Sequence, residues 1–346
     1  MTPRLALVTM GLLLSGSCLA QTTRVKAGGG AGFISRADTP PRKVVVATVV
    51  SNFHGGVDER LERAAQLAGR AANEARKEQG RGPDLIVFPE FAFMRSDTGS
   101  AAERAVSLDS SVGRSLEALA RRHGSWLVAP MILREADSDT ISNAAVLFDR
   151  HGVVAGVFRK VHPVPDHDGL LEGGVTPGEA YPVFECDFGR LGILICWDMA
   201  YEDGWRALAE AGAEIIAVPS ASPQTIRPSA EALRHHVYVV TSTPRNNATL
   251  FDPIGRPIAQ AEPPADVLVH EIDLSYAMLH WSETLHEGRA FTERFGAAAG
   301  FDYSPREDTG IFWSNDPDRT IGSMVRELGL EEMPDTVRRY DEARKQ

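Results

Sequence analysis

Three polar residues of complementary chemistry each end an apolar run that is typical of a buried strand. Glu90 ends LIVFPE, Lys160 ends GVVAGVFRK and Cys196 ends LGILIC. In α/β proteins, side chains at the carboxyl ends of strands leave the core and face a crevice where ligands bind. A carboxylate, an ammonium group and a thiol in this setting therefore indicate one shared site.

Together these groups have the chemistry needed to hydrolyse an acyl compound. A cysteine thiolate attacks the acyl carbon and forms a thioester, which divides one difficult hydrolysis into two easier steps. The carboxylate of Glu90 can accept the thiol proton, return it to a leaving amine and later activate water. The ammonium group of Lys160 can stabilise the developing oxyanion, and the backbone N–H of Trp197 is a second candidate donor.

Alternating strands and helices are expected to position these residues. Each element is recognised by its hydrophobic periodicity. Up to residue 133, strands are expected at 43–50, 84–89 and 125–133, separated by helices at 57–78 and within 105–124. Then follow a hairpin at 142–161, a hairpin turning at Gly189, a helix at 203–214, a strand at 215–222, a helix running into a strand at 230–243, a hairpin at 248–262 and a strand at 266–274. This order predicts a mixed sheet covered by helices.

The segments that carry the three polar residues resemble those of a known family. LIVFPEFAF, FRKVHP and GRLGILICWDMAYEDGWRALAEAGAEIIAVPSA are similar, in order and spacing, to the three characteristic segments of the nitrilase superfamily, the carbon–nitrogen hydrolases. The resemblance implies a four-layer αββα sandwich that assembles as a homodimer or a higher homo-oligomer. It also implies a Glu–Lys–Cys triad formed by Glu90, Lys160 and Cys196, with Glu172 matching a further glutamate of the family.

Two segments depart from the family pattern. The chain has Tyr201-Glu202-Asp203 where the family commonly has Phe-Pro-Glu. In EALRHHVYVV, Glu231 precedes Arg234, whereas in the family pattern the arginine precedes the glutamate. His235 replaces an asparagine of that pattern. Residues three apart on a helix can form an ion pair in either order, so we expect this helix to be kept.

The first twenty residues have the pattern of a secretory signal peptide. One arginine is followed by an apolar stretch from Leu5 to Leu14 and then by small residues, and cleavage is expected after Ala20. The protein is thus predicted to be periplasmic or secreted. Lipid anchoring through Cys18 is the less favoured alternative, because Ser15 stands where lipoprotein signals usually prefer an aliphatic residue. No later segment has the pattern of a transmembrane helix.

The pattern predicts one catalytic domain with extensions at both ends. The expected parts are a signal peptide at 1–20, a linker or N-terminal arm at 21–41, a carbon–nitrogen hydrolase domain at 42–275, and a C-terminal extension at 276–346 that is a candidate for an interface. Helical and strand periodicity is lost after about residue 275, where aromatic residues alternate with charges and turn formers.

Composition and cysteine usage narrow the classes of partner. The formal net charge is −11 and there is no long basic run, so a nucleic-acid surface is disfavoured. The histidines and carboxylates of HPVPDHD, residues 162–168, do not match zinc-ligand spacing, and we expect neither a metal nor an organic cofactor. Cys186 is expected to pack in the core, although a disulfide with Cys196 is an open alternative.

The expected function is hydrolysis of a non-peptide C–N bond in a small amide or N-carbamoyl compound. Asp198 favours this branch, because amidases and carbamoylases of the family often have aspartate two residues after the cysteine, whereas true nitrilases tend to have glutamate. Two alternatives remain open: a nitrile hydrolase of the same family, and a catalytically inactive relative that acts as a binding or assembly module.

Overall fold

Two six-stranded sheets form the centre of the part of the chain that the computed structural model describes, residues 35–136, 138 and 140–345. The predicted signal peptide, with Cys18, lies outside these residues. In spatial order the first sheet contains β12 (Val267–Asp273), β1 (Lys43–Val49), β2 (Leu85–Val87), β3 (Trp126–Arg134), β4 (Ile141–Phe148) and β5 (Val154–Arg159). The second contains β11 (Pro257–Ala261), β10 (Ala248–Phe251), β9 (Tyr238–Ser242), β8 (Ile215–Pro219), β7 (Arg190–Ile193) and β6 (Val183–Glu185).

Each sheet has a parallel centre flanked by antiparallel strands. β1, β2 and β3 are parallel in the first sheet, and β7, β8 and β9 are parallel in the second. The flanking hairpins β4–β5, β6–β7 and β10–β11 are those predicted from the sequence. Because parallel strands end at the same edge of a sheet, the segments after β2 and β7 both emerge at such an edge.

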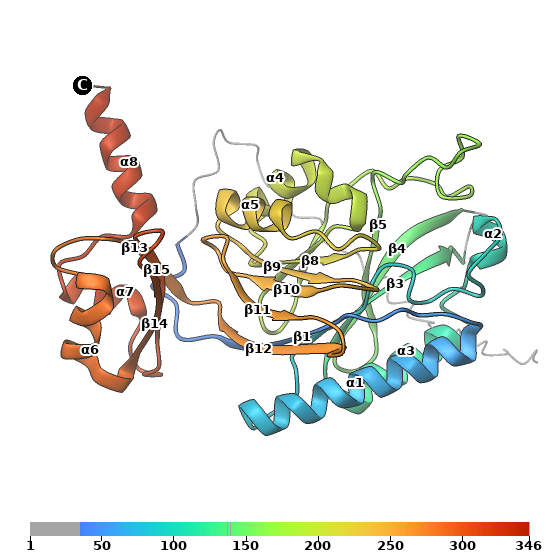
Figure 1. Cartoon of the computed structure of the whole chain (residues 1–346), viewed down its shortest axis with the longest axis horizontal. Helices are drawn as coiled ribbons and strands as arrows, with labels where there is room; N and C mark the ends of the chain where they lie inside the picture. The colour runs from blue at the N-terminus through green and yellow to red at the C-terminus, as the bar shows by residue number, and fades with distance from the viewer. Residues whose placement is uncertain (1–34, 137, 139, 346) are drawn as a thin grey trace, which may run out of the picture. The chain divides into compact units, whose positions relative to one another are not determined.

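Helices cover the outer face of both sheets (Figure 1). α1 (Val57–Gln79) and α3 (Ser111–His123) pack on the first sheet through apolar residues such as Leu67 and Leu116. α4 (Glu202–Glu210) and α5 (Ile226–His235) cover the second sheet, and Trp205 of α4 is fully buried there. The largest apolar cluster joins the inner faces of the two sheets. The predicted αββα sandwich is therefore confirmed.

Within the sandwich, one short α-helix was absent from the sequence prediction. α2 (Ala101–Arg104) has only four residues, too few to show helical periodicity. It is stabilised by a capping box, in which the Ser100 hydroxyl accepts from the Glu103 backbone N–H while the Glu103 side chain accepts from the Ser100 backbone N–H.

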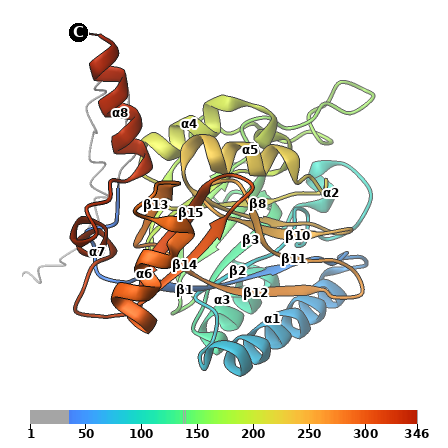
Figure 2. The ribbon, with the colours of Figure 1, turned by 60° about the vertical axis from the view of Figure 1, so that its left-hand side comes forward.

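The residues after the sandwich form a module with its own sheet and core (Figure 2). Its strands lie in the order β13 (Tyr276–His280), β15 (Thr309–Ser314) and β14 (Ala299–Ser304), all antiparallel. α6 (Arg289–Phe295) and α7 (Ile321–Glu327) pack on this sheet through an apolar cluster that includes Phe291, Phe312 and Met324. α8 (Met333–Arg344) follows. We call residues 276–345 the C-terminal module.

The described end of the predicted N-terminal arm is packed against other parts of the chain. Ala37 is 1 % exposed, and its carbonyl accepts a 2.8 Å hydrogen bond from the backbone N–H of Gly322 in α7. Arg36 forms a 2.9 Å ion pair with Glu214 of the sandwich. The arm thus contacts both the sandwich and the C-terminal module.

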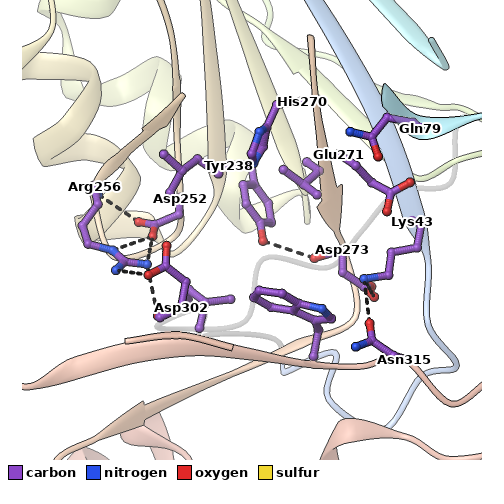
Figure 3. Close-up of a pocket in the computed structure, with 14 residues that line it drawn as sticks. Lys43, Gln79, Tyr238, Asp252, Arg256, His270, Glu271, Asp273, Asp302 and Asn315 are labelled. Atoms are coloured by element: carbon purple, nitrogen blue, oxygen red, sulfur yellow. Dashed lines mark hydrogen bonds and ion pairs between the residues drawn. The ribbon is translucent and has the colours of Figure 1, made fainter. Parts of the chain in front are cut away.

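A cavity of about 540 Å³ lies between the sandwich and the C-terminal module (Figure 3). On one side Arg256 donates to Asp252 of the sandwich at 2.8 Å and to Asp302 of β14 at 3.1 Å. On the other side the ammonium group of Lys43 lies 3.4 Å from Asn315 and 5.2 Å from the ring centroid of Trp313. These contacts connect the two parts around the cavity.

No helix between residues 35 and 345 is both long enough and apolar enough to cross a membrane, as far as the described positions go.

Candidate active site

The structure brings Glu90 and Lys160 together with Glu172 in a buried group. The Lys160 Nζ donates to Glu90 Oε1 at 2.8 Å and to Glu172 Oε1 at 2.5 Å. The side chains of Lys160 and Glu90 are each 1 % exposed, and that of Glu172 is 8 % exposed. A buried charge needs a partner and hydrogen bonds, and here one cation is shared by two carboxylates.

Asn143 of β4 is a further member of this group that the sequence analysis did not identify. Its Nδ2 donates to Glu90 Oε1 and to Glu172 Oε2, each at 2.8 Å. Its backbone carbonyl accepts from the Lys160 backbone N–H at 2.8 Å. The only sequence signal for Asn143 is a polar residue inside an otherwise apolar strand, and this pattern by itself does not separate a site residue from a structural one.

The second carboxylate oxygen of Glu90 is also held in place. Glu90 Oε2 accepts a 2.8 Å hydrogen bond from the backbone N–H of Ala221, which lies after β8. Glu90 is thus fixed by donors from both sheets, and its orientation is set before any substrate binds.

The charge of Lys160 is maintained by its neighbours. Burial alone lowers the pKa of Lys160, but the carboxylates of Glu90 and Glu172 raise that pKa well above its usual range. The ammonium group is therefore positively charged at any physiological pH. Two of its three N–H donors are directed at the two carboxylates, so one donor remains available for a bound group.

The Cys196 thiol lies against the same group. The charges of Glu90 and Lys160 and the side chain of Ser220 all act on the pKa of its thiol. Burial, together with the negative charge of Glu90, raises the pKa of the Cys196 thiol to about 12, although Lys160 and Ser220 oppose this shift. The resting thiol is therefore protonated near neutral pH.

Cys196 has a backbone conformation that is uncommon for a residue with a side chain. Its φ is +47°, in the left-handed region, at the start of a 3-10 helix, η1 (Cys196–Ala200). Such a conformation costs on the order of 1–3 kcal/mol and persists only where the surroundings hold it. Trp197, the candidate oxyanion donor through its backbone, is 43 % exposed.

The remodelled segment at residues 201–203 contacts the loop that follows Lys160. The Tyr201 ring stacks on the His162 ring at a centroid distance of 3.7 Å and an interplanar angle of 8°. The Tyr181 hydroxyl donates to Asp203 Oδ2 at 3.2 Å and lies 3.3 Å from His162 Nδ1. The departure from the family pattern therefore forms a specific cluster beside the site.

The helix with the exchanged glutamate and arginine is kept, as predicted. Glu231 is buried in α5 and lies 3.7 Å from Arg234 and 3.5 Å from His235. Burial lowers the pKa of His235, which favours its neutral form.

Both cysteines of the described chain are free. Cys186 packs against the main apolar cluster, and burial raises the pKa of its thiol. The alternative of a Cys186–Cys196 disulfide is therefore wrong in this structure, and the preferred prediction that Cys186 packs in the core is confirmed.

One group in the described chain has the side chains to hold a metal ion. Ligand atoms of Asp166, His167 and Asp168 lie within 4.8 Å of one another. The His167 and Asp168 side chains are 89 % and 68 % exposed, so this is a solvated loop and not part of the buried group around Lys160.

Comparisons with known proteins point to the same family as the sequence motifs. A family model described as carbon–nitrogen hydrolase matches residues 47–279. The omega-amidase of Xenopus tropicalis is 26 % identical over 240 residues, which cover 63 % of this chain and 84 % of that protein. The deaminated glutathione amidase of Yersinia enterocolitica is 32 % identical over 155 residues, 42 % of this chain and 54 % of that protein. A citrullinase of Francisella tularensis is 28 % identical over 185 residues, 51 % and 61 % of the two chains.

Solved structures show the same fold. Nit3 of Saccharomyces cerevisiae, a member of branch 10 of the nitrilase superfamily, superposes with a TM-score of 0.57 at 24 % identity, covering 67 % of this chain and 90 % of that one. A variant of the amidase from Nesterenkonia sp. AN1, with the acetamide moiety of fluoroacetamide attached to its active-site cysteine, gives 0.56 at 22 % identity, covering 68 % and 92 %.

Proposed function

Because this chain belongs to the carbon–nitrogen hydrolase family, we propose that it is an exported hydrolase of a small amide or N-carbamoyl compound that acts through a thioester on Cys196. The observation that carries the proposal is the buried, hydrogen-bonded group of Glu90, Lys160 and Glu172, whose charges act on the Cys196 thiol. The amidases and the citrullinase among the relatives support this class of substrate.

In the proposed first step, Glu90 removes the thiol proton as the Cys196 sulfur attacks the substrate carbonyl. Transfer during the attack suits a thiol whose pKa is raised to about 12, because a free thiolate is scarce near neutral pH. The remaining N–H of Lys160 and the backbone N–H of Trp197 stabilise the oxyanion. The C–N bond then breaks, and the leaving nitrogen takes the proton from Glu90.

In the second step water hydrolyses the thioester. Glu90, again ionised, removes a proton from water, and the hydroxide adds to the thioester carbon. The C–S bond breaks, the sulfur is reprotonated by Glu90, and the acid product leaves. Glu172 and Asn143 keep Glu90 and Lys160 in place through both steps. All proton and acyl transfers are made by side chains of this chain.

Hydrolysis of a substrate panel tests this proposal. Purified protein is given amides, N-carbamoyl amino acids and nitriles, and release of ammonia is measured. Cys196→Ala should abolish hydrolysis, whereas Cys186→Ala, the matched loss of the other free thiol, should keep it. Hydrolysis that survives Cys196→Ala contradicts the mechanism. Turnover of nitriles alone would favour the nitrile hydrolase, and no turnover by the native protein would favour the inactive relative.

Covalent labelling gives a second measurement on the same proposal. Fluoroacetamide carries an amide that the site should bind, and displacement of its fluoride by the Cys196 sulfur attaches an acetamide group. Mass spectrometry of peptides should find this group on Cys196 and not on Cys186. A general alkylating agent is a poorer probe, because the raised thiol pKa slows its reaction whether or not the site is catalytic.

Export and self-association are also part of the proposal. Export is supported by the signal-like pattern of residues 1–20, and N-terminal sequencing should find the mature chain starting after Ala20. Cytosolic protein with an intact Met1 would contradict it. A homodimer or higher homo-oligomer is supported by Ile226 and Leu233 of α5, which lie seven residues apart on one helical face and are 85 % and 48 % exposed. Light scattering of the purified protein tests this.

A further inference from the structure

We propose that Asp198 is a positioning residue for the proposed hydrolysis, because its carboxylate ties the turn that carries Cys196 to the segment that follows Lys160. The inference rests on the proposed function and concerns the same site. Asp198 has no contact with the reacting atoms that would make it an acid or base. It acts through the placement of the nucleophile.

The first part of the argument is the closed turn around Cys196. The backbone N–H of Asp198 donates to the carbonyl of Ile195 at 3.0 Å, and the backbone N–H of Ile195 donates to Asp198 Oδ2 at 3.1 Å. These two bonds close the four-residue turn from both sides. Cys196 lies inside this turn with its φ of +47°, so the pair of bonds holds the strained conformation that directs the thiol.

The second part is the link to the lysine segment. Asp198 Oδ1 accepts from the backbone N–H of Val161 at 3.1 Å and from that of His162 at 2.7 Å. These are the two residues directly after Lys160. One carboxylate therefore joins the end of β7 to the end of β5, which belong to different sheets.

The third part is that only an ionised carboxylate satisfies this set of donors. Asp198 is 0 % exposed and receives three backbone N–H bonds. An ionised aspartate has only acceptors, whereas an asparagine would turn its NH₂ group against at least one of these donors. A buried N–H without an acceptor costs about 1–3 kcal/mol, so the turn would move to relieve it.

The charged and titratable neighbours of Asp198 decide when it ionises. They are Lys160 at the end of β5, His162 with its Nδ1 at 3.3 Å, and Tyr181, with Asp203 reached through the Tyr181 hydroxyl. Burial raises the pKa of Asp198 to about 6, against the opposing hydrogen bonds of His162 and Ile195 and the charge of Lys160. Protonation below pH 6 therefore removes an acceptor and loosens the turn.

The test compares Asp198→Asn with a matched control, Asp252→Asn. Asp252 is also buried, also has a raised pKa, and also accepts backbone N–H bonds, from Ile254 and Arg256, but it lies in the β10–β11 hairpin away from the site. Asp198→Asn should lower kcat about 10- to 100-fold through misplacement of the nucleophile. KM should stay within about threefold, because substrate contacts are not removed. The native protein should lose activity as the pH falls through about 6, whereas the residual activity of Asp198→Asn should show no such loss.

The outcomes separate the inference from its premise. Asp252→Asn should lower the melting temperature and leave kcat and its pH profile unchanged. Asp198→Glu keeps the charge, so it should retain the loss of activity at low pH, which is the acid limb of the profile. Its kcat should lie between those of the native protein and Asp198→Asn. The inference is overturned if Asp198→Asn keeps native kcat and the native acid limb, or if Asp252→Asn loses activity equally. Failure of the proposed function can be told apart from failure of this inference, because hydrolysis would then survive Cys196→Ala. If Asp198→Asn does not fold, the acid limb and kcat of Asp198→Glu decide the question.

Discussion

Lys160 and Glu90 are each almost fully buried, so the energy of each charge depends on the other. The ammonium group offsets two carboxylates, and Asn143 donates to both of them. Breaking this arrangement strongly lowers the free energy of unfolding, because removing one partner leaves the other charges buried without compensation. At the scale of single residues, the proposed proton transfer by Glu90 and the stability of the fold therefore depend on the same contacts.

Replacement of the lysine tests this dependence. Lys160→Gln leaves Glu90 and Glu172 without a cation, and we expect a loss of about 3–5 kcal/mol in the free energy of unfolding, measured by urea denaturation. Hydrolysis should fall at least about 100-fold because one oxyanion donor is lost. Arg344→Gln is the control, since its ion pair with Asp341 is 3.3 Å long and the two side chains are 79 % and 56 % exposed. That pair should contribute about 0–1 kcal/mol. Equal effects of the two substitutions would contradict the prediction.

At the scale of elements, the end of β5 is fixed by a close backbone contact. The backbone N–H of Gly178 donates to the Lys160 carbonyl at 2.8 Å. A Cβ at position 178 would lie 2.3 Å from the Arg159 carbonyl oxygen. Only a glycine can approach the strand this closely, so the Pro177-Gly178 segment sets the position from which the Lys160 side chain enters the site.

An added methyl group at this position should displace the lysine. Gly178→Ala is expected to cost about 1–3 kcal/mol, since backbone must move to relieve the overlap. Activity should fall because Lys160 moves with its strand. Gly69→Ala is the control: no atom lies within 4 Å of a Cβ built at this position of α1. It should stabilise the protein by about 0.5–1 kcal/mol and leave activity unchanged. Full activity in Gly178→Ala would show that the strand end tolerates the shift.

The elements that carry the three polar residues were predictable because their signals are local. Buried strands, amphipathic helices and turn residues appear directly in the hydrophobic pattern, and the order of these elements indicated the sandwich. Asn143 was missed because a polar residue in a strand becomes part of the site only through contacts with Glu90 and Glu172, which are distant in sequence. The left-handed φ of Cys196 was equally hidden, since it depends on the bonds to Asp198.

The C-terminal module was not predictable from the same pattern for a different reason. β13 pairs with β15 across the residues that form α6 and β14. Strand pairing over such a separation is set by tertiary packing and not by local periodicity. The roles of the triad and the boundaries of the predicted domains stay predictions, which the substitutions above address.

At the scale of the whole molecule, three parts of the chain meet at a few polar contacts. The arm contacts the C-terminal module through an ion pair of Asp38 with Arg326 at 2.7 Å. Arg256 connects the sandwich to β14, as Figure 3 shows. The Ser35 hydroxyl donates to Glu332, the residue before α8, at 2.7 Å. These parts also meet through apolar side chains, since Tyr276 and Met278 belong to the apolar cluster of the sandwich and Ala37 belongs to that of the module. The charged contacts add a sensitivity to pH and salt that the apolar packing does not have.

The Glu332 carboxyl determines in which direction the stability of the fold changes with pH. Burial raises the pKa of its carboxyl from the ordinary value of 4.5 to about 7, with the charges of Asp335 and Asp38 adding to the rise and the hydrogen bond from Ser35 opposing it. A raised folded-state pKa favours the protonated form in the native protein. The stability that Glu332 contributes is therefore complete below about pH 4.5 and is lost as the pH rises to about 7.

Glu332→Gln should accordingly stabilise the protein above pH 7 and have little effect below pH 4.5. Allowing for screening by solvent at this half-buried position, we expect a gain on the order of 1–2 kcal/mol at pH 8. Melting temperatures of the native protein and the variant, measured from pH 4 to pH 8, check this. Glu331→Gln is the neighbouring control of opposite sign: hydrogen bonds from Arg339 and Thr336 lower the pKa of Glu331, so its replacement should destabilise the protein slightly at pH 8. Parallel melting curves for native protein and Glu332→Gln across this range would mean that the Glu332 carboxyl is hydrated in solution and does not make the stability of the fold depend on pH.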